Sequence, residues 1–176
     1  MHKLVALFLL FAISACSSAP NVPDGVIVPT KTLLPMIKSR PYECYEYDAT
    51  DDTCKALAER TINGNTLTMD TEAREFVPGF GPFTLNLIAT FKMGETSFCG
   101  DLSKSDIEIS GGLPSNFRKD VVRSLRRDLA KDGVTCIAYL RDAQGQFYSV
   151  TLDGAGEVKG AADPVVFFAQ PKEVSL

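Results

Sequence analysis

A short apolar run near the amino terminus is the feature that most constrains this chain, because it indicates the compartment in which the chain folds. Residues 1–3 carry one lysine and are followed by ten uncharged residues, 4–13. As a helix, this run would be about 15 Å long, half the thickness of a bilayer core of about 30 Å. A cationic start, a short apolar core and small residues are typical of a secretory signal peptide. The sequence therefore predicts that the rest of the chain folds after export, where disulfides persist.

The apolar run ends in Ile13-Ser14-Ala15-Cys16. An aliphatic residue, two small residues and a cysteine resemble the lipobox of bacterial lipoproteins, and the resemblance covers residues 1–16. It implies a signal peptide at 1–15, cleavage before Cys16 and a covalent lipid on that thiol. Ser17 implies sorting to the outer membrane, facing the periplasm. The alternative is an ordinary signal peptide in which Cys16 is incidental.

Loss of residues 1–15 would leave 161 residues without the only histidine, His2, and with a formal charge of −5. Histidine is the usual general base near neutral pH and the commonest metal ligand. The expected mature chain therefore excludes a Ser-His-Asp or Cys-His catalytic site and a zinc site that contains histidine. The acidic balance argues against nucleic-acid binding, which needs a basic footprint. We expect no cofactor beyond the lipid.

Four cysteines remain after Cys16: Cys44, Cys54, Cys99 and Cys136. An even number in an exported chain predicts two disulfides, for which three pairings are possible. Pairing of sequence neighbours is favoured, as Cys44–Cys54 and Cys99–Cys136. The alternative is a four-cysteine zinc site, but the CxxC pairs typical of such sites do not occur.

Five of the ten prolines fall within residues 17–41. Such a composition favours an extended chain, so residues 16–41 are predicted to be a lipidated tether and 42–176 a single globular domain. Two apolar runs interrupt the tether, at 26–28 and 33–37. They could pack on the domain, one as an edge strand, or bind a partner by adding to a sheet edge.

Alternating apolar residues and turn signals predict strands along most of the domain. The expected strands are residues 42–47, 54–62, 65–69, 83–93, 97–99, 134–140, 146–152 and 165–169. Residues 55–60 also have helix propensity, but Asn63-Gly64 predicts a hairpin turn and favours a strand there. Residues 114–132 are predicted to form an amphipathic helix, because Phe117, Val121, Val122, Leu125 and Leu129 recur at helical spacing. The expected fold class is α+β: an antiparallel sheet with one amphipathic helix packed on it, stapled by disulfides.

The opposite face of the predicted helix is basic. It carries Lys119, Arg123, Arg126 and Arg127, which could contact anionic lipid headgroups or an acidic partner. The alternative is an ordinary solvated face, balanced by Asp120 and Asp128.

Carboxylates offer two further candidates for chemistry. Asp48, Asp51 and Asp52 could hold calcium, but they lack EF-hand spacing and Asp is common in turns. We therefore expect no metal there. A pair of carboxylates could also serve a histidine-free hydrolase. The possible members are Glu43, Glu46, Glu95, Asp101 and Glu108.

These features favour a membrane-anchored envelope lipoprotein whose domain binds a protein or polymer of the envelope and is not an enzyme. A carboxylate hydrolase is one alternative. An inhibitor of an enzyme that attacks the envelope is another, by analogy with small disulfide-bonded lipoproteins.

Overall fold

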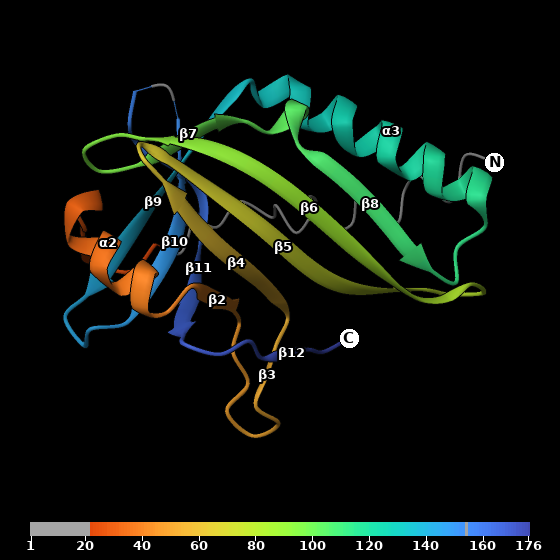
Figure 1. Cartoon of the computed structure of the whole chain (residues 1–176), viewed down its shortest axis with the longest axis horizontal. Coiled ribbons are helices and arrows are strands. Elements are labelled where there is room, and N and C mark those ends of the chain that lie inside the picture. The colour runs from red at the N-terminus through yellow and green to blue at the C-terminus, as the bar shows by residue number, and fades with distance from the viewer. Residues whose placement is uncertain (1–21, 154) are drawn as a thin grey trace.

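A closed antiparallel β-barrel of eight strands is the centre of the molecule (Figure 1). The computed structural model describes residues 22–153 and 155–176. The barrel strands, in chain order, are β2 (Tyr42–Tyr45), β4 (Ala56–Asn63), β5 (Thr66–Val77), β6 (Gly81–Met93), β7 (Phe98–Asp101), β9 (Val134–Asp142), β10 (Phe147–Leu152) and β11 (Val158–Phe168). Neighbours run in the order β9-β10-β11-β2-β4-β5-β6-β7, and the pairing of β7 with β9 closes the ring.

The predicted α+β fold, one helix packed on a sheet, is wrong. The antiparallel pairing was anticipated, but the sheet curls until its two ends meet. The alternation of apolar and polar residues along a strand indicates which residues face a core. The same pattern occurs in an open sheet and in a barrel, so it does not distinguish between them. The pairing of Phe98 with Ile137 and of Cys99 with Cys136 closes the barrel, and it joins strands that are far apart in the sequence.

Strand β6 follows its alternating sequence pattern, whereas its hairpin partner β5 continues to Val77, eight residues beyond the predicted end at Met69. Phe83, Ala89 and Phe91 lie on one face of β6 and are buried, and Leu85 and Leu87 on the same face pack against core residues. Ile88, Thr90 and Lys92 on the other face are exposed. The preceding hairpin, β4 to β5, turns at Gly64, whose φ of 57° lies in the left-handed region. Asparagine and glycine are favoured in such two-residue turns, so the strand predicted at 54–62 and its return strand are confirmed.

Short strands are added outside the ring. β1 (Gly25–Ile27) pairs with β9, and β8 (Asp106–Gly111) pairs with β6. β3 (Thr53–Cys54) and β12 (Glu173–Val174) form a separate parallel pair. The apolar run predicted at 26–28 as a possible edge strand is therefore largely such a strand.

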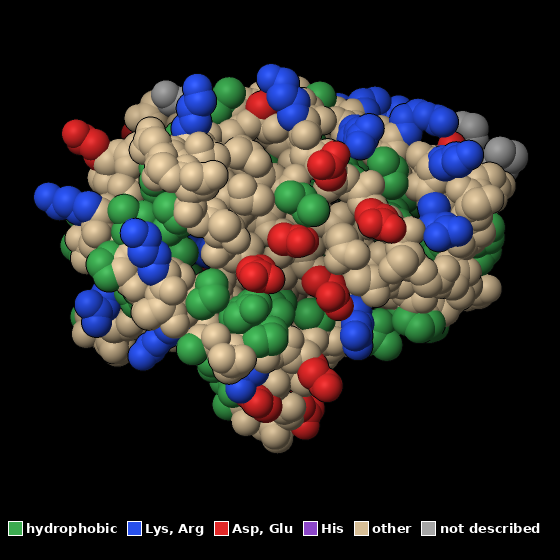
Figure 2. All heavy atoms as spheres, in the orientation of Figure 1, with side chains coloured by type: hydrophobic (Ala, Val, Ile, Leu, Met, Phe, Trp, Pro, Cys, Tyr) green, Lys and Arg blue, Asp and Glu red, His purple; other side chains and the backbone are tan. Residues whose placement is uncertain are grey.

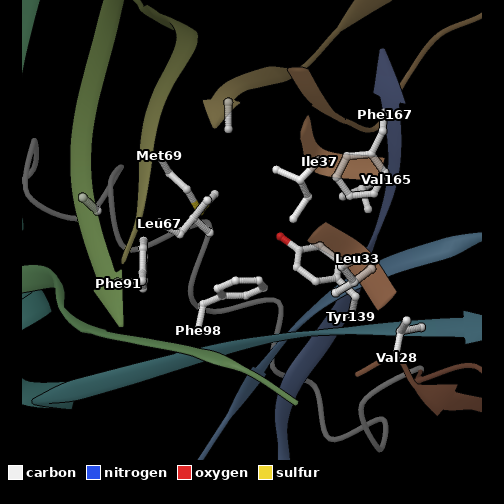
Figure 3. Close-up of a cluster of buried hydrophobic side chains, with 12 residues drawn as sticks. Val28, Leu33, Ile37, Leu67, Met69, Phe91, Phe98, Tyr139, Val165 and Phe167 are labelled. Atoms are coloured by element: carbon white, nitrogen blue, oxygen red, sulfur yellow. The ribbon is translucent and has the colours of Figure 1, made fainter. Parts of the chain in front are cut away.

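Helix α2 (Thr30–Ser39) packs against the main barrel core. Leu33 and Ile37, one helical turn apart, are each 1% exposed and pack with Tyr139 and Phe167 of the barrel core (Figure 3). Thr30 Oγ1 donates to the carbonyl of Gly94 at 2.5 Å, which ties the helix to the β6–β7 turn. Residues 22–41, which the sequence assigns to a tether, thus contribute a strand and a helix to the folded structure.

Helix α3 (Ser115–Asp132) occupies the residues predicted for it and ends at Gly133, where φ is 65°. It follows β8 and a short 3₁₀ helix, η2 (Leu102–Lys104). Its apolar stripe packs on a second core, outside the main barrel core. This core is built from Val77, Phe83, Leu85, Ile109, Leu113, Phe117, Val121, Val122 and Leu125. Among the described residues, no helix has the length and apolarity needed to cross a bilayer.

Both predicted disulfides are present. Cys44 and Cys54 are joined with their Cα atoms 5.4 Å apart, and Cys99 and Cys136 with theirs 4.0 Å apart. The second disulfide connects β7 to β9 at the closure of the barrel. The intervening segment contains η2, β8 and α3, so the disulfide also holds the two ends of this segment together.

Candidate functional site

An open groove with a volume of about 550 Å³ lies between helix α3 and strand β8. We call it the α3–β8 groove. Its floor is apolar and its walls are charged. The lining residues are Ile107, Glu108, Ile109, Ser115, Arg118, Lys119, Val122, Arg123 and Arg126.

Helical geometry brings the groove cations together. Residues three or four apart lie on the same side of a helix, so Arg118, Val122 and Arg126 form one row and Lys119 and Arg123 a second. The neighbouring residues Val121 and Leu125 belong to the core packed beneath α3. Burial of the apolar stripe therefore fixes the rotation of the helix and directs its basic flank to the groove.

Three of the four helix cations predicted as contacts, Lys119, Arg123 and Arg126, line the groove. The fourth, Arg127, does not; its guanidinium donates to Ser124 Oγ at 3.1 Å. Sequence analysis missed Arg118, although its spacing of eight residues from Arg126 places it on the same side of the helix.

The groove cations have few partners of their own. Arg123 Nη1 lies 2.8 Å from Asp120 Oδ1, in a pair whose side chains are both largely exposed. Exposed pairs of this kind contribute little, about 0–1 kcal/mol. Arg118 Nη1 donates to the backbone carbonyl of Ile109 at 3.4 Å. Four cations thus face one groove carboxylate, Glu108, so the groove is positively charged.

The outer face of the sheet beside the groove has the opposite charge. Figure 2 shows Lys and Arg side chains along the α3 edge and Asp and Glu side chains across the neighbouring sheet. Cross-strand register places Glu59 of β4 directly opposite Asp70 of β5, and Ile88 of β6 between Asp70 and Asp106 of β8. Like charges placed directly opposite destabilise a sheet. The groove and this acidic face share Glu108 and meet along β8.

A polar cluster lies inside the barrel. Arg60 of β4 forms an ion pair with Glu43 of β2 and donates to the Tyr139 hydroxyl of β9, which in turn donates to Glu43 Oε2 at 3.2 Å. Both charged side chains are inaccessible to solvent. The Arg60 guanidinium also lies over two rings, 4.8 Å from the Tyr139 centroid and 5.1 Å from that of Phe167.

Burial governs the protonation of this cluster. It raises the pKa of Glu43 well above its usual range and lowers the pKa of Arg60 to about 9. Burial, followed by the charge of Glu43, raises the pKa of Tyr45. Such shifts can mark a functional site, but structural ion pairs produce them as well. Because Glu43 and Arg60 are inaccessible to solvent and paired with each other, the cluster holds three barrel strands together.

The five carboxylates considered for a hydrolase do not share a cleft. Glu43 is inside the barrel, Glu46 is exposed and 3.5 Å from Lys55 Nζ, and Asp101 caps η2 by accepting from Ser103. Glu95 lies in the exposed β6–β7 turn, and Glu108 lines the groove. Neither the groove nor the second cavity, of about 210 Å³ between α2 and the β10–β11 pair, is lined by two carboxylates.

The aspartates considered for calcium are used in local contacts. Asp48 Oδ1 accepts from the backbone N–H of Thr50 at 2.7 Å, as Asp commonly does in turns. Asp52 accepts from Tyr47 at 2.7 Å and pairs with Lys172 at 2.8 Å. In residues 22–153 and 155–176, no group of three or more His, Cys, Asp or Glu side chains is arranged to hold a metal ion.

Comparison with known proteins adds no relative. Searches against protein-family models, curated proteins and solved structures return no match. Function is therefore inferred from the chemistry of the α3–β8 groove. The predicted lipid carrier, Cys16, lies outside the described residues.

Proposed function

We propose that this protein is a lipoprotein of the bacterial envelope, anchored through Cys16, whose folded domain binds a partner and is not an enzyme. The α3–β8 groove is the binding surface, and its partner is anionic. The observation that carries this proposal is the convergence of Arg118, Lys119, Arg123 and Arg126 on one apolar-floored groove. Cations that gather in a concave surface attract and orient a partner of opposite charge.

The arrangement supports binding better than catalysis. An apolar floor supplies contact area, while surrounding charged groups give orientation and specificity. The groove has one carboxylate, Glu108, so it lacks the pair of carboxyl groups that a histidine-free hydrolase needs. A lipid on Cys16 would hold this domain at an outer-membrane surface facing the periplasm.

The binding proposal is tested with fluorescently labelled polyglutamate and the full-length chain. Arg123→Glu/Arg126→Glu reverses two groove charges, and Arg127→Glu/Lys131→Glu makes the same change on the same helix outside the groove. We expect the groove variant to bind about thirtyfold more weakly, since each of the two lost charged contacts costs about 1 kcal/mol and about 1.4 kcal/mol is tenfold. The control should bind about as the natural chain does. Equal effects of the two double substitutions would contradict the proposal.

The anchor is tested separately, by uptake of a radiolabelled fatty acid. The natural chain should incorporate the label, and Cys16→Ser should abolish incorporation. A natural chain that takes up no label would reject the lipoprotein proposal without affecting the groove.

A further inference from the structure

One wall of the α3–β8 groove is an open sheet edge. Within the described residues, β8 pairs with β6 and with no other strand. Alternate residues of an antiparallel strand direct their backbone groups to opposite neighbours. The Ile109 carbonyl accepts from Arg118 Nη1 on the α3 side, at the long distance of 3.4 Å. Ile109, and therefore Ile107, present their backbone groups to the groove and not to β6.

An exposed edge of this kind is a template for another strand. Natural proteins often protect an edge by placing a charge on it or by covering it. Here the cations of α3 stand beside the edge, and the groove between them is about 550 Å³. The six residues of β8 span about 20 Å, which is the length of an ordinary strand.

From this geometry, and resting on the proposed function, we propose that an extended acidic segment of a partner protein adds as a strand to the free edge of β8, in the α3–β8 groove. Backbone hydrogen bonds to Ile107 and Ile109 would supply affinity, and alternate side chains would supply specificity. The charge of the groove identifies the segment as acidic.

The pairing of the added strand with β8 predicts which positions of the partner segment are acidic. In an antiparallel pair, residues directly opposite one another place their side chains on the same face of the sheet. The Ile109 side chain is packed in the core beneath α3, so residues opposite Ile107 and Ile109 face the helix cations. The residues between them lie beside Asp106 and Glu108, where a carboxylate would be repelled. The segment should therefore carry acidic residues at every second position, with neutral or basic residues between them.

The test uses labelled peptides of about eight residues, a common strand length, in which Glu and Thr alternate. The full-length chain should bind this peptide more tightly than a block peptide of the same composition, with all Glu before all Thr. Two further series carry N-methyl groups on every Glu or on every Thr. Each N-methyl group removes the backbone N–H donor of the residue that carries it and leaves every charge unchanged.

Antiparallel addition predicts about thirtyfold weaker binding for the N-methyl-Glu series, because the backbone bonds to Ile107 and Ile109 are both lost, each contributes about 1 kcal/mol, and about 1.4 kcal/mol is tenfold. The N-methyl-Thr series should bind within about twofold of the parent. The reverse asymmetry would indicate parallel addition and would also support a strand.

Other outcomes separate the two proposals. Equal affinities of both N-methyl series would overturn strand addition and leave an anion-binding groove intact. Binding of a short-chain anionic phospholipid with no binding of the alternating peptide would overturn it in favour of a lipid ligand. If no anionic probe binds, strand addition and the proposed function both fail.

Discussion

Cys99 and Cys136 lie directly opposite one another across β7 and β9, and their disulfide joins the two strands that close the barrel. The 37-residue separation between them spans η2, β8 and α3. One covalent bond therefore stabilises the closure of the barrel and fixes the ends of the segment that forms the α3–β8 groove.

Replacement of both cysteines by serine should destabilise the fold by about 4 kcal/mol, because the chain-entropy model assigns that value to a loop of this length. Cys44→Ser/Cys54→Ser, which opens a loop of separation 10, should cost about 3 kcal/mol by the same model. Urea unfolding of both variants measures the two losses. A loss at Cys99–Cys136 that is smaller than the loss at Cys44–Cys54 would contradict this assignment.

The buried pair of Glu43 and Arg60 predicts a marked difference between single and double substitutions. Glu43→Leu or Arg60→Met alone leaves one charge without its partner inside the barrel, and should cost about 3–5 kcal/mol in the free energy of unfolding. Replacement of both by apolar residues should recover most of that loss, since paired burial of charge is often no better than apolar packing. Chemical denaturation of the three variants provides the comparison. Additive losses would show that the two side chains do not act as a pair.

Helix α2 should contribute to stability although its residues lie in a proline-rich region. Leu33→Ala should cost about 2–4 kcal/mol, because a leucine that is 1% exposed leaves a cavity when it is truncated. Lys31→Ala, at an exposed position of the same helix, is the matched control and should change the unfolding midpoint little. Equal midpoints for both variants would indicate that residues 30–39 behave as a tether.

Asp101 should make stability depend on acid pH. Hydrogen bonds from the Ser103 side chain, then Lys104, lower the pKa of Asp101 below its usual value. A carboxyl group whose pKa is lower in the folded state stabilises the fold above its unfolded pKa of about 3.9, and this contribution is lost as pH falls through the folded pKa.

The stability advantage of the natural chain over Asp101→Asn should therefore shrink as pH falls from neutral to below about 3. Thermal unfolding of both chains across this range measures it. Ser103→Ala removes the largest cause of the shift and should reduce the same pH dependence. An advantage that stays constant with pH would rule out this role for Asp101.

Local features were predictable where the pattern and the structure obey the same geometry. The stripe from Phe117 to Leu125 has helical spacing, and α3 buries that stripe. Alternation along β6 marks the residues that face the core. Pairing of cysteine neighbours was also correct. Helix α2 was missed because Pro29 and Pro35 indicated an extended chain, whereas Pro29 precedes the first turn and the buried Leu33 and Ile37 hold the helix in place.

The candidate site was only partly predictable. Sequence spacing identified Lys119, Arg123 and Arg126 as one basic face, because their relative positions depend on the helix alone. It did not show that this face borders the free edge of β8, since helix α3 and that edge meet only through tertiary packing. The buried partnership of Glu43 with Arg60 was equally hidden, because the barrel brings their strands together.

By itself, the sequence determined many of the elements whose causes are local: most of the barrel strands at least in part, the amphipathic helix, the turn at Gly64 and the cysteines available for pairing. It did not predict β8, the strand that borders the groove. It also supports the prediction of a lipid anchor at Cys16. Only the tertiary structure decided that the sheet closes into a barrel and that a cationic helix lies beside an open edge. The reason is physical: periodicity records which face of an element is buried, whereas the pairing of β7 with β9 and the position of α3 depend on contacts between distant segments.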